Sequence, residues 1–111
     1  MNFDQRIFES VERATPEKPY GLVQILSYVD ALERVFLSRR ELAGGLQRLI
    51  EEGRIAGLPG HKFHGLPAGS PPGKFSGLTH AEYDQACKAY HEWFEKTWNE
   101  LKKTHPFFQR K

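Results

Sequence analysis

The stretch Leu37–Ile55, LSRRELAGGLQRLIEEGRI, constrains the fold more than any other part of this sequence. Leucine and isoleucine recur in it at helical spacing, so one face of a helix is suited to burial. Ser38 and Glu41 form a capping box at its start, and Gly53 stands where a left-handed glycine ends a helix. We therefore predict one helix from Ser38 to about Glu52.

The segments before this helix also carry helical periodicity. An opening helix, capped by Asn2 or Asp4, is predicted to end near Ala14, before the prolines of TPEKPYG. From about Tyr20 the periodic pattern resumes, which predicts a second helix. Its apolar positions, at three- and four-residue spacings, are Leu22, Ile25, Leu26, Val29 and Leu32.

Short strands and a long helix are predicted after Gly53. RIAGL and HKFHGL are candidate strands, and the LPGH between them places Pro and Gly in the central positions of a turn. The segment PAGSPPGK is too rich in Pro and Gly for regular structure and predicts a mobile loop. Thr79 and Glu82 form a second capping box, which opens a C-terminal helix of about residues 80–103. The predicted class is α+β and mainly helical.

Composition bounds the function without defining it. With 111 residues the chain is expected to form a single domain over 1–111. A net charge of +2 is too small to argue for nucleic acid by itself. Cys87 is the one cysteine, which fits a reducing cytoplasm. The sequence has no long apolar run and no secretory segment, so we expect a cytoplasmic protein without a membrane partner.

The capped helix and its flanks also match a known sequence pattern. A Leu-Ser start leads into periodic leucines and then into an acidic pair, Gly, one variable residue and Ile; these residues are Leu37, Ser38, Leu42, Leu49, Glu51, Glu52, Gly53 and Ile55. This pattern resembles winged helix-turn-helix proteins, particularly bacterial regulators of the MarR and PadR kind. FSGLTHAEYD is similar to the exit from the wing in that family, with Leu78 and Thr79 at the matching pair.

The resemblance covers roughly Tyr20–Asp84. It implies a winged helix, with three helices and a short β-hairpin wing, whose core spans about residues 20–84 and is followed by the long C-terminal helix. It also implies a DNA-binding function of the transcription-regulator kind, with double-stranded DNA as partner. Winged helices serve as protein-binding and structural modules as well, because a fold alone does not fix a role.

The outward face of the capped helix is the candidate DNA-binding surface. At about 100° per residue, Arg40, Ala43, Gly44, Gln47 and Glu51 cluster opposite the leucines, with Arg48 at the flank. Arginine and glutamine suit the edges of bases, while small residues allow a close approach to the helix backbone. Together with a hairpin lysine placed near phosphates, the predicted nucleic-acid-binding residues are Arg39, Arg40, Ala43, Gly44, Gln47, Arg48 and Lys62.

Two other interpretations of this face stay open. Its arginines are balanced by Glu41, Glu51 and Glu52, so the helix is neutral by count. A protein partner is therefore an alternative to DNA. A solvent-exposed face without any partner is the third possibility, in which Gly45 serves close packing against a neighbouring helix.

The final helix carries more aromatic residues than a core of this size can cover. Tyr83, Tyr90 and Phe94 follow one side of it, with tryptophans beside them. We therefore expect a homodimer or a protein partner at this helix. The predicted interface residues are Trp93, Trp98, Phe107 and Phe108.

Neither a metal site nor a catalytic site is predicted. His61 and His64 are three apart in a candidate strand, so they point to opposite faces, and no third ligand is near them in sequence. Cys87 and His91 have helical spacing, but Cys87 lies beside the aromatic stripe, where a small buried residue is expected. The sequence also lacks a phosphate-binding loop and a nucleophile elbow. We expect no cofactor and no enzyme activity.

Overall fold

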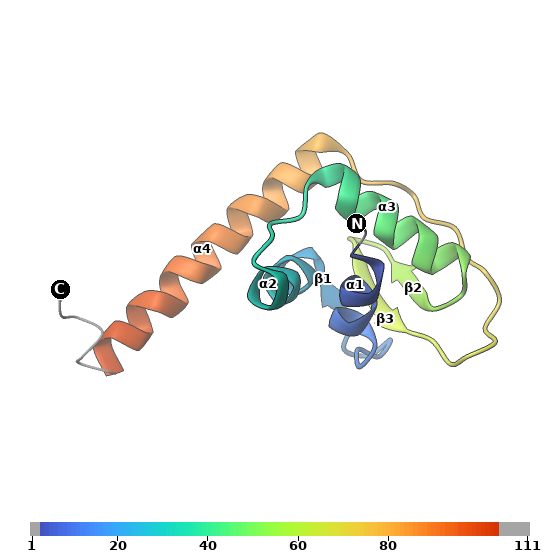
Figure 1. Cartoon of the computed structure of the whole chain (residues 1–111), viewed down its shortest axis with the longest axis horizontal. Helices are drawn as coiled ribbons and strands as arrows, with labels where there is room; N and C mark the ends of the chain where they lie inside the picture. Colours follow the sequence, from blue (N-terminus) through green and yellow to red (C-terminus); the bar gives the residue numbers. More distant parts are fainter. Residues whose placement is uncertain (1–2, 105–111) are drawn as a thin grey trace.

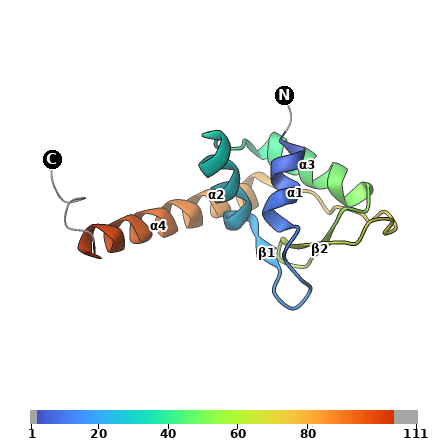
Figure 2. The same cartoon turned by 60° about the horizontal axis from the view of Figure 1, so that its bottom comes forward.

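The computed structural model describes residues 3–104, in which helices and short strands alternate. In chain order the elements are α1 (Asp4–Val11), β1 (Tyr20–Gly21), α2 (Leu22–Glu33), α3 (Arg39–Glu51), β2 (Ile55–Leu58), β3 (Lys62–Gly65) and α4 (His80–Thr104). The chain is α+β and mainly helical, as predicted. Figures 1 and 2 show α4 leading away from the other elements, past α2. Within residues 3–104, every helix is too short or too polar to cross a lipid bilayer.

Helix α3 is the predicted capped helix. The Ser38 hydroxyl accepts a hydrogen bond from the Glu41 amide at 3.1 Å, and the Glu41 carboxylate accepts one from the Ser38 amide at 2.9 Å. Gly53 follows the helix with a φ of 73°, a left-handed conformation that glycine adopts without steric cost. The prediction of one helix from Ser38 to Glu52, followed by a two-stranded hairpin, is confirmed.

A third strand joins the predicted hairpin. β2 and β3 pair antiparallel, and β1 pairs with the other edge of β3, so the strand order is β1-β3-β2. Tyr20, in β1, lies opposite Phe63, whereas the sequence pattern places Tyr20 in the second helix. That helix begins at Leu22 instead. A strand of two residues is too short to show an alternating pattern in the sequence. It is defined only by its pairing with β3.

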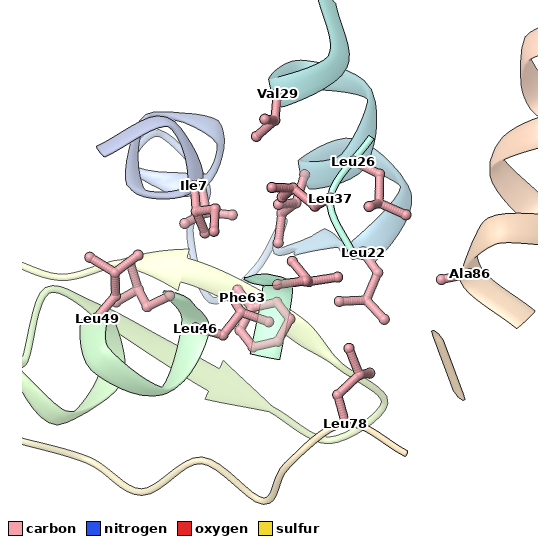
Figure 3. Packing of buried hydrophobic residues seen from close by; sticks show 14 of the residues in the cluster. Ile7, Leu22, Leu26, Val29, Leu37, Leu46, Leu49, Phe63, Leu78 and Ala86 are labelled. Atoms are coloured by element: carbon pink, nitrogen blue, oxygen red, sulfur yellow. The ribbon is translucent and has the colours of Figure 1, made fainter. Parts of the chain in front are cut away.

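The hydrophobic core lies between the first three helices and one face of the sheet. Ile7, Ile25, Leu46 and Phe63 come from four different elements, and each is at most 1 % exposed. Figure 3 shows Phe63 of β3 lying among the side chains of α2 and α3. Leu32 does not join them despite its helical spacing. It is 50 % exposed because it lies in the last turn of α2, where the described residues cover it only in part.

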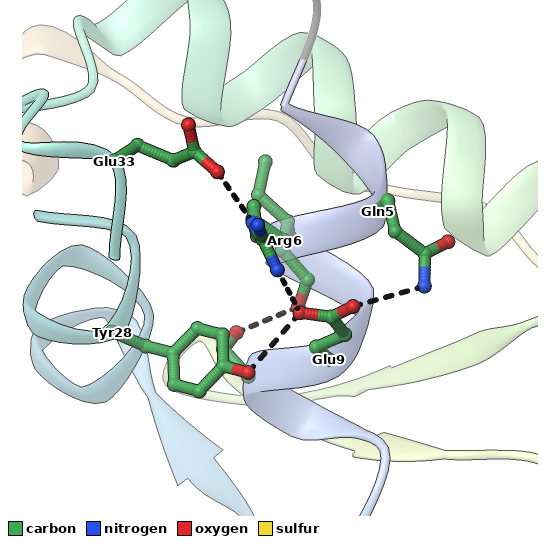
Figure 4. Close-up of polar contacts among 7 residues, drawn as sticks. Gln5, Arg6, Glu9, Tyr28 and Glu33 are labelled. Carbon is green, nitrogen blue, oxygen red and sulfur yellow. Dashed lines mark hydrogen bonds and ion pairs between the residues drawn. The ribbon is translucent and has the colours of Figure 1, made fainter. Parts of the chain in front are cut away.

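Helix α1 is tied to α2 by a polar network that Figure 4 shows. The Arg6 guanidinium donates to Glu33 on α2 and, at 3.0 Å, to Glu9 on its own helix. The Tyr28 hydroxyl of α2 also donates to Glu9, at 3.1 Å. The bond from Arg6, followed by one from Gln5, holds the pKa of Glu9 below its ordinary value. The network therefore fixes α1 on α2 and favours the charged form of Glu9.

The N-terminus of α1 differs from the expectation. Phe3 is the N-cap and makes no side-chain capping bond, while Asp4 is the first helical residue. The predicted cap by Asp4 is therefore wrong, and Asn2 lies outside the described residues. The Asp4 carboxylate points to another helix instead, where it accepts hydrogen bonds from Arg48.

The connection between β3 and α4, residues 66–79, lies along α3. The Gly73 amide donates to the Ile50 carbonyl at 2.9 Å. The Ser70 carbonyl lies against Gly53, too close for any side chain at that position. The segment rich in Pro and Gly, expected as a mobile loop, is thus irregular but packed on the end of α3. It leads into the predicted capping box of α4, which is confirmed.

Candidate nucleic-acid interface on α3

The outer strip of α3 consists of Arg40, Gly44, Gln47 and Glu51. These residues lie on the side of the helix opposite its buried leucines; Gly44 is half-buried and the other three are exposed. α1 runs along one edge of the strip and the β3–α4 connection along the other (Figure 1). Within residues 3–104, no further element covers the strip. The predicted outward position of these residues is confirmed.

The two adjacent glycines of α3 have different surroundings. A Cβ on Gly45 would overlap the Cδ1 atom of Ile7 and lie 3.2 Å from the Asp4 carboxylate, so glycine at this position gives α1 room to approach α3 closely. A Cβ on Gly44 would meet only the guanidinium of Arg48, at 3.3 Å. Gly45 therefore allows close helix packing. Gly44, which has no side chain, leaves the helix backbone accessible in the middle of the outer strip.

Arg48 forms the strongest polar contact beside the strip. Its Nε and Nη2 atoms donate to the two carboxylate oxygens of Asp4 at 2.7 and 2.9 Å. These hydrogen bonds raise the pKa of Arg48 above its ordinary value. The pair joins the first turn of α1 to the last turn of α3, and it neutralises Arg48 in the folded chain. The Arg48 side chain is still half exposed, so another anion can reach it.

The remaining predicted residues of α3 have mixed surroundings. The Arg39 guanidinium donates to the Leu78 carbonyl at 3.0 Å, so it supports the chain just before α4. Ala43 is half-buried against the core at the edge of the strip. The Gln47 amide donates to the Glu51 carboxylate at 3.1 Å on the exposed side of the helix. Arg40 has no ion pair among the described residues 3–104 and projects from the strip.

Lys62 does not lie with the outer strip. It opens β3, and its ammonium stands 3.2 Å from the position of a Cβ on Gly21, at the start of α2. The sheet packs on the core side of α3, away from the strip. The structure therefore brings together Arg40, Gly44 and Gln47, with Arg48 beside them, but separates Lys62 from them.

The tip of the hairpin is held against α4. The Nε2 atom of His61 lies 3.1 Å from the Glu82 carboxylate, and its ring lies close to those of Phe63 and Phe75. This contact, together with hydrogen bonds from Thr79, lowers the pKa of Glu82; the backbone bond from Thr79 has the largest effect. The hairpin tip is thus fixed on the first turn of α4.

The two histidines of HKFH have separate environments. His61 lies in the turn with a φ of 55°, so it precedes β3, whereas His64 is buried within the strand, with its Nδ1 atom 3.0 Å from the Gly65 carbonyl. Among residues 3–104, no group of three His, Cys, Asp or Glu side chains is arranged to hold a metal ion.

The cysteine expected to be buried is only partly so. Cys87 is half-buried on α4, beside Tyr83. Burial, and then a hydrogen bond with Cys87, raise the pKa of Tyr83 to about 12. The Tyr83 hydroxyl also donates to the Leu37 carbonyl, which fixes this turn of α4 to the segment before α3. These contacts have a structural role.

Chemically, the outer strip can recognise a polar groove. Arg40 offers a planar set of donors, and Gln47 offers an amide that both donates and accepts. Glu51 at one end and Glu41 near the other supply negative charge, so the strip has no concentrated positive field. No family model, curated protein or solved structure matches the chain.

The sequence alone does not indicate that Asp4 belongs to this region. Its carboxylate lies beside the strip because α1 crosses α3 at Gly45, and 44 residues separate it from Arg48 in sequence. The one available signal is the paired glycine itself, since a glycine on the flank of a buried helix face indicates a close neighbour. The identity of that neighbour is not encoded locally.

The far end of α4 carries a second exposed surface. We define the distal α4 face as Trp93, Phe94, Trp98 and Leu101, which are 47, 49, 40 and 36 % exposed. Trp93 and Trp98 are predicted interface residues, and in the described part of the chain both are partly exposed. Phe107 and Phe108, predicted for the same interface, lie outside the described residues.

Proposed function

We propose that this chain is a winged-helix protein that binds double-stranded DNA through the outer strip of α3, in the manner of a cytoplasmic transcription regulator. The order of elements supports the proposal, since two helices lead into the capped helix α3, and a hairpin follows at once. The antiparallel sheet packs on the core side of α3 and leaves the opposite side of that helix open.

One observation carries the proposal. Arg40 and Gln47 stand two helical turns apart on the same uncovered side of α3, with Gly44 between them. The missing side chain at Gly44 lets the helix backbone lie close to a surface. Both flanking side chains then reach past it, and their donors and acceptors match guanine and adenine edges in the major groove.

Arg48 adds a conditional phosphate contact. In the folded chain its guanidinium is held by Asp4, yet the pair is partly exposed, and exposed ion pairs are worth little energy. A DNA phosphate offers the same bidentate acceptor geometry as the carboxylate. Arg48 can therefore exchange Asp4 for phosphate when the strip lies in a groove.

The test is fluorescence anisotropy with labelled random duplex DNA at low and at moderate salt. We expect the wild-type chain to bind, and Arg40→Ala to lose about 1–3 kcal/mol of binding free energy if Arg40 reads a base. Arg13→Ala is the matched control, because it removes the same charge from the exposed segment after α1. It should change affinity only slightly.

Two results would contradict DNA binding by this strip. The first is a wild-type chain that does not bind duplex DNA at low salt. The second is an equal loss for Arg40→Ala and Arg13→Ala, which would indicate attraction by overall charge.

A protein-binding winged helix is the second candidate function. The observation that favours it concerns the four arginines of residues 37–55. Two of them, Arg39 and Arg48, already donate hydrogen bonds to acceptors within the protein. Acidic residues also interrupt the strip at Glu51. On this alternative, the outer strip contacts a polar protein surface, and the anisotropy experiment shows no DNA binding at either salt concentration.

A further inference from the structure

The distal α4 face continues an apolar stripe whose first half is already buried. Along α4, Tyr83, Cys87, Tyr90, Phe94 and Leu101 recur at spacings of three, four or seven residues, so they share one side of the helix. The first part of this stripe packs on the domain, where Tyr90 is 6 % exposed. Beyond Tyr90 the side chains remain large and apolar, but exposure rises to 49 % at Phe94.

The distal α4 face borders a hollow between α4 and α2. Its volume is about 210 Å³, and its α2 wall consists of Ser27, Asp30 and Ala31. The Asp30 carboxylate accepts a hydrogen bond from the Tyr90 hydroxyl at 2.9 Å. The rings of Phe94 and Trp93 stand beside Tyr90, with centroids about 6 Å from it. The hollow is thus apolar and flanked by large rings.

We propose that a second copy of this chain covers the distal α4 face, with its own distal α4 face in the reciprocal position. Each copy presents both the hollow and the rings beside it, which is the self-complementarity that a two-fold interface requires. The first half of the stripe on α4 packs against another helix, α2. A helix is therefore the kind of surface that we expect to fit the second half of the stripe. The α4 helix of another copy supplies such a surface.

The available area agrees with a specific dimer. A large aromatic side chain offers about 150–250 Å² in total, and the four residues of the distal α4 face are between 36 and 49 % exposed. They therefore present roughly 350 Å² per copy, or about 700 Å² for two copies. At the usual apolar share of about 60 %, this corresponds to an interface of roughly 1,200 Å², the lower limit of stable complexes.

This proposal does not depend on DNA binding, and it is tested on the full chain without DNA. Sedimentation velocity from low to high micromolar concentration should show a monomer converting to a dimer in the wild type. Phe94→Glu should weaken the dimer at least tenfold, because it places a charge in the apolar contact. Its circular dichroism at low concentration should match the wild type, and its melting temperature should fall only moderately, since Phe94 is half exposed in one copy.

Leu32→Glu is the matched control. Leu32 is apolar and 50 % exposed, like the residues of the distal α4 face, and it lies in the last turn of α2 outside the hollow. This variant should dimerise like the wild type. Equal weakening by both variants would overturn the proposal, as it would indicate unspecific apolar association. A wild type that stays monomeric at high micromolar concentration would also overturn it, whether another protein or the terminal residues of the same chain cover the face.

Discussion

Helices α3 and α4 each place one side in the same core, but they expose opposite kinds of surface. The outer strip of α3 carries Arg40 and Gln47 around a glycine, whereas the distal α4 face carries tryptophan, phenylalanine and leucine. Among residues 3–104, both surfaces are at least partly exposed in a single copy. The difference teaches that exposure alone does not identify a partner. A polar strip with an accessible helix backbone is suited to a groove lined by fixed hydrogen-bonding groups. An apolar face is suited to the apolar surface of a protein partner.

The difference also follows from where each helix ends. α3 stops at Gly53, close to the edge of the core, because the β3–α4 connection packs against that glycine. α4 extends past α2, away from the core (Figures 1 and 2). Its apolar spacing continues beyond the surface that could bury it. The long helix is therefore the part of the chain that a partner would complete.

The largest expected effect on the free energy of unfolding distinguishes a buried core position from a position on the distal α4 face. Leu46→Ala should lower the free energy of unfolding by about 2–5 kcal/mol, since Leu46 is fully buried on α3. Phe94→Ala removes a larger side chain, yet it should cost well under half as much, because Phe94 is half exposed. Urea denaturation at low protein concentration, where assembly contributes little, measures both. Equal losses would mean that Phe94 is part of the core of one copy.

The two adjacent glycines of α3 should respond in opposite directions. Gly45→Ala overlaps Ile7, and overpacking of this kind costs about 1–3 kcal/mol against a gain in helix propensity of about 1 kcal/mol, so we expect a net loss of stability. Gly44→Ala meets only the movable Arg48 side chain and should gain up to about 1 kcal/mol. Thermal melting of the two variants provides the comparison. A stabilised Gly45→Ala protein would contradict the close α1–α3 contact.

Local patterns explain which parts of the fold could be predicted. The boxes at Ser38 and Thr79 bind backbone groups three residues away, so the sequence contains both partners and the helix starts are confirmed. Strand β1 could not be predicted, since Tyr20 becomes a strand residue only by pairing with Phe63. Periodicity alone also misplaces Leu32, because it reports the side of a helix but not where the covering layer ends.

The candidate site divides in the same way. Helical geometry predicts the outward position of Arg40 and Gln47 correctly, since it needs only the spacing within α3. It cannot predict that Asp4 binds Arg48 or that Lys62 lies at the start of α2. Both depend on how distant elements cross. The charge that the strip can offer to a ligand is thus a property of the tertiary structure.

An intermediate effect is expected at Tyr90, the boundary between the buried and exposed halves of α4. Burial, and then the hydrogen bond to Asp30, raise the pKa of Tyr90 to about 12, against about 10 in the unfolded chain. A raised pKa stabilises the fold fully below pH 10, and this contribution is lost as the pH rises from 10 to about 12. Tyr90→Phe should lower stability by about 1 kcal/mol at neutral pH.

The alkaline comparison gives the control for that variant. Between pH 10 and 12 the wild type should lose more stability than Tyr90→Phe, so the two unfolding free energies should converge. Tyr83, whose pKa is also about 12, contributes equally in both proteins and cancels in the difference. Parallel curves would show that the pKa of Tyr90 is not raised, so that its hydroxyl is neither buried nor bound to Asp30 in solution.

The smallest expected effect on stability concerns Asp4. The same residue gives a specific test of the proposed phosphate contact of Arg48. Asp4→Asn removes the charge that neutralises Arg48, and the loss of a partly exposed ion pair should cost less than about 1 kcal/mol of stability. Affinity for duplex DNA should nevertheless rise several-fold, because Arg48 can then bind a phosphate without first releasing the charged carboxylate of Asp4. Asp84→Asn, an equal charge change at the exposed start of α4, should raise it less. If the two variants bind DNA equally well, Arg48 makes no phosphate contact, and the outer strip would have only Arg40 and Gln47 for recognition.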